Sequence, residues 1–254
     1  MRIWKNYIFQ ARGDNLNDYE VKDFYRSNYA KDFAETHAKY MKVCEILKNC
    51  RRVLDIGCGD GSFCTMLMEN LKNSEIYGVD ISEEAVKIAS SKGIRAYQSN
   101  VGEEAFPFGN EFLDGVFCGE VIEHLYNPDH LLDEIYRILG KDGVCILTTP
   151  NLASWYNRIF LLLGYQPLFT EVSQKYGVGH PFRWWIGAGH IRVFTLKALT
   201  ELVTIHKFRI VSKIGFGINT RVGYGERWSM IAKVANKIFS NPSLSSDIML
   251  VLKK

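Results

Sequence analysis

The chain has 254 residues with 47% hydrophobic and 23% charged side chains and a formal net charge of +3. This composition is ordinary for a globular α/β domain with a sizeable core, and it excludes a low-complexity chain. No apolar run reaches the length of a membrane span, and the first residues lack the apolar core of a signal peptide.

Strand and helix patterns alternate through the first 151 residues. The first 45 residues have a helical pattern that leads into the first strand. Strand patterns follow at 53–57, 75–82, 95–100, 114–121 and 143–151, and helical patterns at 62–71, 82–93 and 129–140. The helix at 82–93 opens with Ser82 and two glutamates and closes at Gly93, as a capped helix does. This order predicts a parallel sheet with helices on both faces.

The alternation stops after Asn151. Residues 151–190 are rich in Trp, Tyr, Phe and Gly, and a helix at 195–207 and strands at 208–217 and 247–254 follow. Residues 218–246 include an amphipathic stretch, RWSMIAKVANKIF. We interpret 1–254 as one domain in which residues 1–45 form a helical lid. The insertions at 151–190 and 218–246 would cap the substrate side; a membrane contact and a dimer contact are the other interpretations.

Charge and cysteines add two expectations. Residues 175–254 carry 13 Lys and Arg against 3 Asp and Glu, whereas the first 174 carry 18 against 25. This basic C-terminal region is either solvated surface or a face for an anionic substrate or membrane surface. The six cysteines, at positions 44, 50, 58, 64, 118 and 145, form no CxxC pair. We therefore expect unpaired thiols in a cytoplasmic protein, with peripheral membrane contact as an option. Nothing in the sequence indicates an oligomeric state.

A glycine-rich loop, Gly57-Cys58-Gly59-Asp60-Gly61, joins the first strand to its helix. Such a loop lets a ligand approach the backbone closely, and Asp80, 19 positions after Gly61, can hold a ribose diol. The spacing GxGxG differs from the GxGxxG of dinucleotide sites. Asp55 would repel a pyrophosphate but would help to hold the ammonium and sulfonium of S-adenosylmethionine, directly or through water. The loop therefore favours S-adenosylmethionine over NAD.

The segments VLDIGCGDG, YGVD, LDGVFCGEVIEHL and LGKDGVCILTTPN resemble class I S-adenosylmethionine-dependent methyltransferases, over residues 45–215. The resemblance implies a Rossmann-like, mostly parallel seven-stranded sheet whose last strand is antiparallel. It implies S-adenosylmethionine as cofactor, bound by Asp55, Gly57, Cys58, Gly59, Gly61, Asp80, Ile81, Asn100, Val101 and Glu120. In that scheme Asp80 holds the ribose and Asn100-Val101 meet the adenine. Many members have Asp at position 100, and the Asn carbonyl can still accept from the adenine amine.

The segment Glu120-Val121-Ile122-Glu123-His124 follows the fourth strand. Methyl transfer requires alignment, and a hydroxyl nucleophile also requires deprotonation. If a helix begins here, Glu120, Glu123 and His124 share one face and form a divalent-metal half-site for Mg²⁺, Mn²⁺ or Zn²⁺. A metal there would lower the pKa of an acceptor hydroxyl. The other interpretation is a cofactor-pocket wall, with His124 or His190 as a general base or a hydrogen-bonded histidine.

A narrower resemblance connects this segment with His190. Ubiquinone-pathway O-methyltransferases and small-RNA 3′-terminal 2′-O-methyltransferases have ExxEH here and a later histidine before the helix that follows the insertion. By that resemblance Glu120, Glu123, His124 and His190 would be metal ligands, with Glu120, His124 and His190 as catalytic groups. Two further groups have a functional and a packing interpretation: His180 with Arg183, Trp184 and Trp185 as an acceptor grip, and Tyr25, Tyr29 and His37 in the lid.

The sequence thus predicts an S-adenosylmethionine-dependent methyltransferase that acts on a hydroxyl of a small molecule, sugar, lipid-linked glycan or quinone precursor. RNA 2′-O-methylation is the alternative: the basic C-terminal region permits it, but no RNA-binding module is visible, so we favour the small acceptor. A cofactor-binding partner protein without catalysis is the third interpretation. The intact Asp55, Asp80 and Glu120 argue against it.

Overall fold

The computed structural model describes residues 38–173, 176–180, 189–217 and 241–254. Several expectations concern residues outside this part of the chain: the lid residues Tyr25, Tyr29 and His37, the triplet Arg183, Trp184 and Trp185, and the amphipathic stretch at 227–239. Among the described residues, every helix is too short or too polar to span a bilayer.

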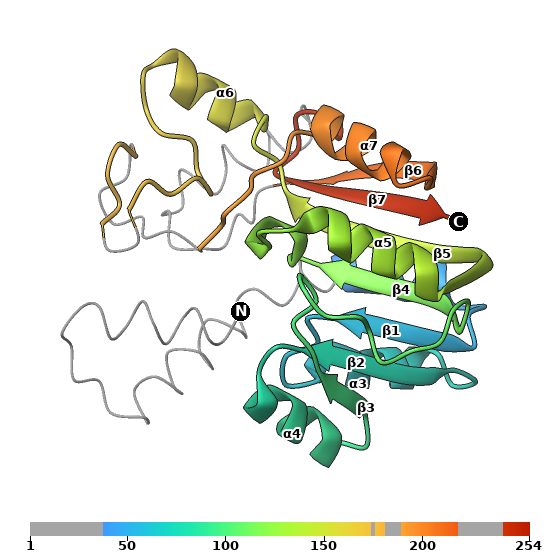
Figure 1. Cartoon of the computed structure of the whole chain (residues 1–254). Helices are drawn as coiled ribbons and strands as arrows, with labels where there is room; N and C mark the ends of the chain where they lie inside the picture. Colours follow the sequence, from blue (N-terminus) through green and yellow to red (C-terminus); the bar gives the residue numbers. More distant parts are fainter. Residues whose placement is uncertain (1–37, 174–175, 181–188, 218–240) are drawn as a thin grey trace, which may run out of the picture.

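A seven-stranded sheet in the order β3-β2-β1-β4-β5-β7-β6 forms the centre of the fold (Figure 1). Its strands are β1 Arg52–Ile56, β2 Glu75–Asp80, β3 Arg95–Gln98, β4 Leu113–Gly119, β5 Leu139–Pro150, β6 Arg209–Phe216 and β7 Asp247–Lys253. The pairs from β3 to β5 are parallel, and β7 runs antiparallel to both of its neighbours. The predicted Rossmann-like sheet with an antiparallel last strand is confirmed.

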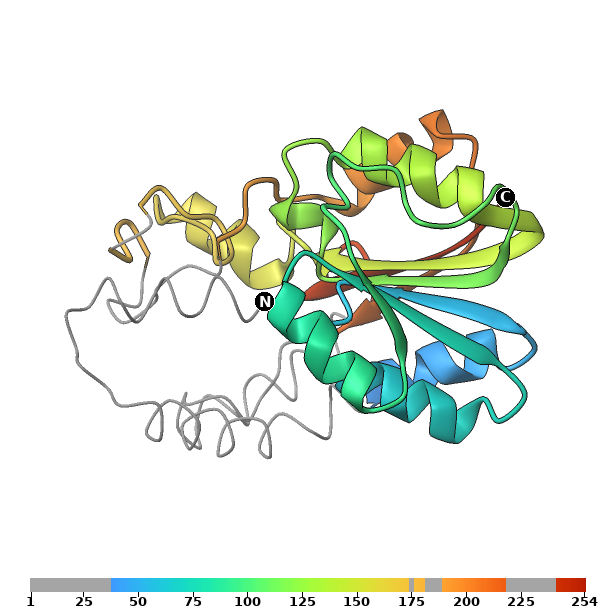
Figure 2. The same ribbon diagram turned by 60° about the horizontal axis from the view of Figure 1, so that its bottom comes forward.

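Helices cover both faces of this sheet (Figure 2). The long helices are α3 Ser62–Asn70, α4 Glu83–Ser91, α5 Pro128–Ile138, α6 Trp155–Leu162 and α7 Leu196–Ile205, and residues 38–47 are also helical. One core cluster joins the sheet to α5 and α7, and the other joins it to α3, α4 and the helix at 38–47. Because both faces are covered, β1 and β4 are buried over nearly their whole length.

Local signals in the sequence set the helix ends. Ser82 caps α4 by accepting a hydrogen bond from the Ala85 amide, as its position predicts. Asn127 caps α5 in the same way, and Pro128 occupies the first turn, where its missing N–H costs nothing. The helix that we expected to reach Gly140 ends at Ile138, because Leu139 is already extended and pairs with Leu113 of β4.

The carboxyl ends of the parallel strands lie at one edge of the sheet, on the side where α6 projects (Figure 1). The antiparallel β7 starts at this same edge, so Asp247 lies opposite Pro150 at the end of β5. The chain leaves β5 there and forms α6, which has a small core of its own built on Tyr156 and Leu168. Ligand sites of open α/β sheets form at this edge.

Candidate functional site

The glycine loop has the backbone conformation that its sequence predicts. Gly57, Gly59 and Gly61 have φ values of 75°, 54° and 75°, which side-chain-bearing residues rarely adopt. A Cβ at Gly57 would lie 2.5 Å from Val121 Cγ2, and one at Gly61 would lie 2.3 Å from Ile94 Cδ1. A Cβ at Gly59 would meet nothing within 4 Å. Gly57 and Gly61 therefore allow the loop to pack closely against neighbouring side chains, whereas Gly59 faces open space.

The predicted ribose acid lies against this loop. Asp80 accepts hydrogen bonds from the amides of Gly59 and Ser82, each at 2.9 Å. The next residue, Ile81, leaves 56% of its surface exposed although it is apolar. The structure thus brings the middle of the loop, the acid and an exposed apolar side chain together at the end of β2.

Other predicted cofactor residues have partners within the protein. The Cys58 side chain is buried and packs on Gly78, where an added Cβ would lie 2.7 Å from Cys58 Sγ. Val101 is also buried. Asn100 Oδ1 accepts from the Gly102 amide at 3.2 Å, so one lone pair of the expected adenine acceptor is already used.

Asp55 lies near the end of β1, as predicted, but its carboxylate is buried. It lies within β1, is only 3% exposed, and accepts a hydrogen bond from Cys64 Sγ of α3 at 3.3 Å. Burial raises the pKa of Asp55 to about 7, and the nearby charge of Asp80 adds to the shift. A cation bound beside the loop would favour the ionised form.

This burial predicts a pH dependence of folding. The folded protein keeps the Asp55 proton up to about pH 7, whereas the unfolded chain releases it near pH 3.8. The contribution of Asp55 to stability should therefore fall as pH rises from about 4 to 7, by on the order of 4 kcal/mol, and stay level above. We expect Asp55→Asn to make the pH dependence of stability shallower in urea unfolding, whereas Glu69→Gln, an exposed acid on α3, should leave it unchanged. An unaltered slope in Asp55→Asn would contradict the raised pKa.

The segment after β4 does not begin the α-helix on which the shared-face argument depended. Glu120 has a φ of 55°, and only a single 3-10 turn, η1 Ile122–His124, follows it. The positive φ turns the chain before η1 begins, so the condition is not met and Glu120 does not share a helical face with Glu123 and His124.

Glu120 instead has partners of its own. It accepts from Lys39 Nζ and from Thr148 Oγ1, and Lys39 Nζ also lies 3.5 Å from Asp247 Oδ2. Burial alone would lower the pKa of Lys39, but the two carboxylates outweigh it and raise that pKa. Lys39 therefore stays charged and ties the helix at 38–47 to the ends of β4 and β7.

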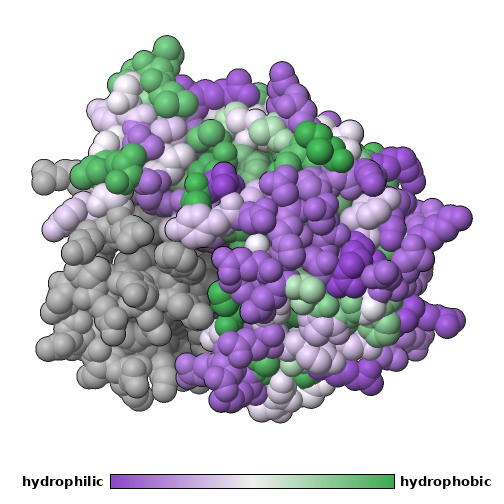
Figure 3. Space-filling view, in the orientation of Figure 1, coloured by the Kyte–Doolittle hydropathy of each residue, from purple (hydrophilic) through white to green (hydrophobic). Residues whose placement is uncertain are grey.

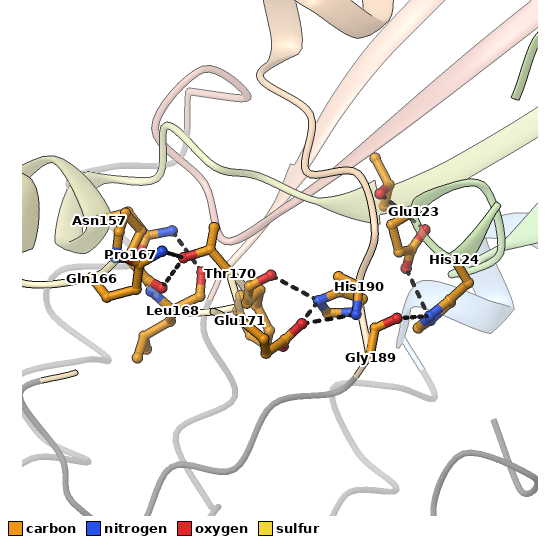
Figure 4. Close-up of polar contacts among 12 residues, drawn as sticks. Glu123, His124, Asn157, Gln166, Pro167, Leu168, Thr170, Glu171, Gly189 and His190 are labelled. Carbon is orange, nitrogen blue, oxygen red and sulfur yellow. Dashed lines mark hydrogen bonds and ion pairs between the residues drawn. The ribbon is translucent and has the colours of Figure 1, made fainter. Parts of the chain in front are cut away.

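A second cluster combines Glu123 and His124 with His190. One possible ligand atom from each lies within 4.8 Å of the others, and the three side chains come from η1 and from the segment before α7 (Figure 4). Glu123 is 1% exposed; its Oε2 accepts from Thr149 Oγ1 at 3.0 Å, while Oε1 has no hydrogen-bond partner. Burial, aided by the charge of Glu120, raises the pKa of Glu123 well above its ordinary value.

Backbone carbonyls orient both histidines. His124 Nδ1 lies 3.1 Å from Gly189 O, and His190 Nδ1 lies 2.9 Å from Phe169 O. A carbonyl can only accept, so each Nδ1 carries a hydrogen, and in the neutral ring Nε2 is the nitrogen with the free lone pair. Burial lowers the pKa of His124 to about 4, so this ring is neutral at pH 7. Two oriented imidazoles and a carboxylate oxygen without a hydrogen-bond partner, 4.0 Å from His124 Nε2, form a donor set that suits a divalent metal.

His180 lies apart from this cluster. It is buried in the insertion, and its Nδ1 lies 3.2 Å from Gln166 O, which fits the packed-loop interpretation. The sequence reasoning missed Lys39, Thr148, Thr149 and Asp247. The two threonines had a usable signal, because TTPN places polar side chains at the carboxyl end of β5. Lys39 had none, because its carboxylate partners are 81 and 208 residues away.

Comparison with known families fits this architecture. The family described as a methyltransferase domain matches residues 25–213. The chain belongs to this methyltransferase family. A ubiquinone biosynthesis O-methyltransferase of Psychrobacter arcticus is 30% identical over 125 residues, 45% of this chain and 46% of that protein. A carboxy-S-adenosyl-L-methionine synthase of Campylobacter jejuni is 27% identical over 144 residues, 53% of this chain and 58% of that one.

The fold of this methyltransferase-family chain also matches a solved structure. The crystal structure of a SAM dependent methyltransferase from Archaeoglobus fulgidus superimposes with a TM-score of 0.62 at 22% identity, covering 93% of this chain and 100% of that one. The likeness at this identity concerns the fold. The chain spans about half the length of the two curated relatives named above.

Proposed function

We propose that this protein transfers the methyl group of S-adenosylmethionine to a hydroxyl, with a divalent metal held by Glu123, His124 and His190. The observation that carries the proposal is the buried Oε1 of Glu123, which has no hydrogen-bond partner, lies 4.0 Å from His124 Nε2 and clusters with both oriented histidines at the sheet edge where the glycine loop lies. Family membership supports the methyl transfer.

The loop fits the cofactor. The open space at Gly59 lets a ligand lie against the backbone, and Asp80 supplies carboxylate oxygens that can accept from ribose hydroxyls. The exposed Ile81 offers an apolar surface beside them. S-adenosylmethionine, when bound, supplies an electrophilic methyl group on a positively charged sulfur, and the chain's task is to align an acceptor with it.

The donor set fits a metal as well. Thr149 fixes one oxygen of Glu123, and the carbonyls of Gly189 and Phe169 fix the two imidazoles. Three protein ligands leave coordination positions free, as catalytic sites require. A divalent metal bound there would lower the pKa of an acceptor hydroxyl beside it.

The low pKa of His124 favours this interpretation over general-base catalysis by that residue. A histidine with a pKa of about 4 is a weak base for a hydroxyl proton at pH 7. The lone pair on His124 Nε2 is well suited to a metal, because no proton has to be displaced from that nitrogen at pH 7. The O-methyltransferase among the relatives supports a hydroxyl acceptor, and small molecules, sugars, lipid-linked glycans and quinone precursors remain in the proposed class.

Calorimetry on the chelator-treated protein tests the proposal. We expect one site for S-adenosylhomocysteine and one for Mn²⁺, Mg²⁺ or Zn²⁺, followed by metal-dependent methylation of catechol as a model vicinal diol. No binding of S-adenosylhomocysteine would overturn the methyltransferase proposal. Cofactor binding and methylation that persist unchanged in chelator would overturn the metal alone.

A further inference from the structure

The chain that returns from α6 contacts both the backbone and the ring of His190. We name residues 166–171 the return segment. Figure 4 shows a series of polar contacts that runs through it from Asn157 of α6 to His190. Through these contacts the insertion after β5 reaches a residue of the metal cluster.

Polar contacts fix the return segment to α6. Asn157 is fully buried; its Oδ1 accepts from the Leu168 amide at 2.8 Å, and its Nδ2 donates to Leu168 O at 3.3 Å. Within the segment, Gln166 Nε2 donates to Thr170 Oγ1, which donates to Pro167 O, each at 2.7 Å. Figure 3 shows hydrophobic side chains at the surface where α6 lies in Figure 1, so the outer face of α6 is not what holds the segment. Buried polar groups with satisfied partners hold it in one conformation.

The backbone of Phe169 has an unusual conformation. Its φ is 68°, in the left-handed region that residues with a side chain rarely adopt. The carbonyl of this residue accepts from His190 Nδ1 at 2.9 Å, and its ring centroid lies 5.8 Å from the imidazole centroid. Strain of this kind persists where the surrounding structure imposes it, and it is concentrated at functional sites. The return segment therefore has a costly conformation at the residue that contacts the His190 ring.

Glu171 contacts the backbone of the same histidine. Its side chain is 9% exposed, and its Oε2 accepts a hydrogen bond from the His190 amide at 2.8 Å. Its Oε1 lies 3.7 Å from His190 Nδ1, which is too far for a hydrogen bond. A carboxylate forms a stronger hydrogen bond with an amide than a neutral acceptor does. Glu171 thus fixes the position of the His190 backbone, and Phe169 fixes the rotation of the ring.

The turn η1 holds the chain that follows His190. The backbone carbonyl of Glu123 accepts from the amides of Ile191 and Arg192 at 2.8 and 3.0 Å. These bonds fix the two residues after the histidine, whereas the bond from the His190 amide goes to Glu171. The return segment therefore supplies a constraint on His190 that η1 does not.

We propose that Glu171 is a positioning residue for metal binding: by accepting from the His190 amide, it holds the imidazole so that Nε2 is available to the cluster with Glu123 and His124. Partners that orient a metal-binding histidine are often nearly as important as the ligands themselves. The statement about metal rests on the proposed function, whereas the orientation of the His190 ring does not.

Calorimetric titration of the full chain with Mn²⁺ tests the role in metal binding. We expect Glu171→Ala to bind Mn²⁺ about 10- to 100-fold more weakly, because His190 loses the bond that places it. Glu171→Gln keeps the size of the side chain and an oxygen that can accept from the amide, so its affinity should stay within about threefold of the wild-type value.

Thr170→Val is the matched control in the same segment. Its hydroxyl donates to Pro167 O and makes no bond to His190, so this variant should bind Mn²⁺ as the wild type does. All three variants should keep wild-type affinity for S-adenosylhomocysteine, which shows that they fold.

Nitrogen-15 NMR of the metal-free chain follows the His190 ring directly. In the wild-type protein the ring, assigned by its absence in His190→Gln, should be the tautomer with hydrogen on Nδ1, since Phe169 O accepts from that nitrogen. Glu171→Ala should give a mixture of the two tautomers, and Glu171→Gln should restore the wild-type signal.

Three outcomes would overturn the role of Glu171. The first is wild-type Mn²⁺ affinity or a wild-type tautomer in Glu171→Ala, and the second is an equal loss in Glu171→Gln and Glu171→Ala. The third is a loss in Thr170→Val as large as in Glu171→Ala, which would assign the effect to packing of the return segment. If Mn²⁺ does not bind the wild-type protein but Glu171→Ala still changes the tautomer, the proposed function fails and the orientation of His190 by Glu171 stands.

Discussion

In the Glu123→Gln variant we expect metal affinity to fall by about 100-fold or more while the affinity for S-adenosylhomocysteine stays at the wild-type value. The amide keeps the size of the side chain and can still accept from Thr149. The amide lacks the negative charge that attracts a metal ion, however. In the wild-type protein this carboxylate is buried, and a buried charge is costly unless a cation compensates it. Methyl transfer should be lost together with metal binding.

Calorimetry and thermal unfolding check this expectation without an activity assay. Metal at 100 times its dissociation constant should stabilise the wild-type protein by about 3 kcal/mol and leave Glu123→Gln unaffected. Metal affinity should also decline as pH is lowered, since the raised pKa of Glu123 means that a proton must leave before a metal binds.

The control is Glu120→Gln, which separates the four-ligand set implied by sequence resemblance from the three-residue cluster in the structure. Glu120 bonds to Lys39 and Thr148 and lies outside the cluster. We expect Glu120→Gln to keep its metal affinity even though it weakens the ion pair with Lys39. Equal loss of metal in both variants would restore Glu120 as a ligand, and undiminished metal binding by Glu123→Gln would remove Glu123 from the site.

The strands were predictable because each rests on a local pattern, whereas the seven-stranded sheet with its antiparallel last strand was implied by the family resemblance. Buried apolar runs gave β1 and β4, and the cap at Ser82 gave the start of α4. The loop conformation was also predictable, since Gly57, Gly59 and Gly61 all adopt the positive φ that favours glycine. These features depend on residues that are neighbours in the chain.

The candidate site was predictable only in part, because its geometry depends on distant residues. The spacing ExxEH does not distinguish an α-helix from a single 3-10 turn, and the positive φ at Glu120 separates it from Glu123. The contact between His124 and His190 joins segments 66 positions apart, and only a family resemblance connected them. The sequence suggested that Asp55 contacts the cofactor. Its burial depends on how α3 packs and places Cys64 against it, and no local pattern in the sequence shows this.

Gly59→Ala should weaken the binding of S-adenosylhomocysteine by about 10- to 100-fold with only a modest loss of stability. The new methyl group meets no protein atom within 4 Å, so it enters the open space beside Asp80 that we assign to the cofactor. Its folding cost is the left-handed backbone alone, about 1 to 2 kcal/mol.

The chain contains a matched control for that strain. Gly93, after α4, has a φ of 84° and also has nothing within 4 Å of an added Cβ, but it lies away from the sheet's carboxyl edge. Gly93→Ala should therefore destabilise the protein about as much as Gly59→Ala in urea unfolding and leave cofactor affinity unchanged. Equal affinities in the two variants would show that the open side of Gly59 faces solvent, and the cofactor would then have to lie elsewhere along the edge. A loss confined to Gly59→Ala cannot come from backbone strain, because both variants carry it, and would place the ligand against this one residue of the loop.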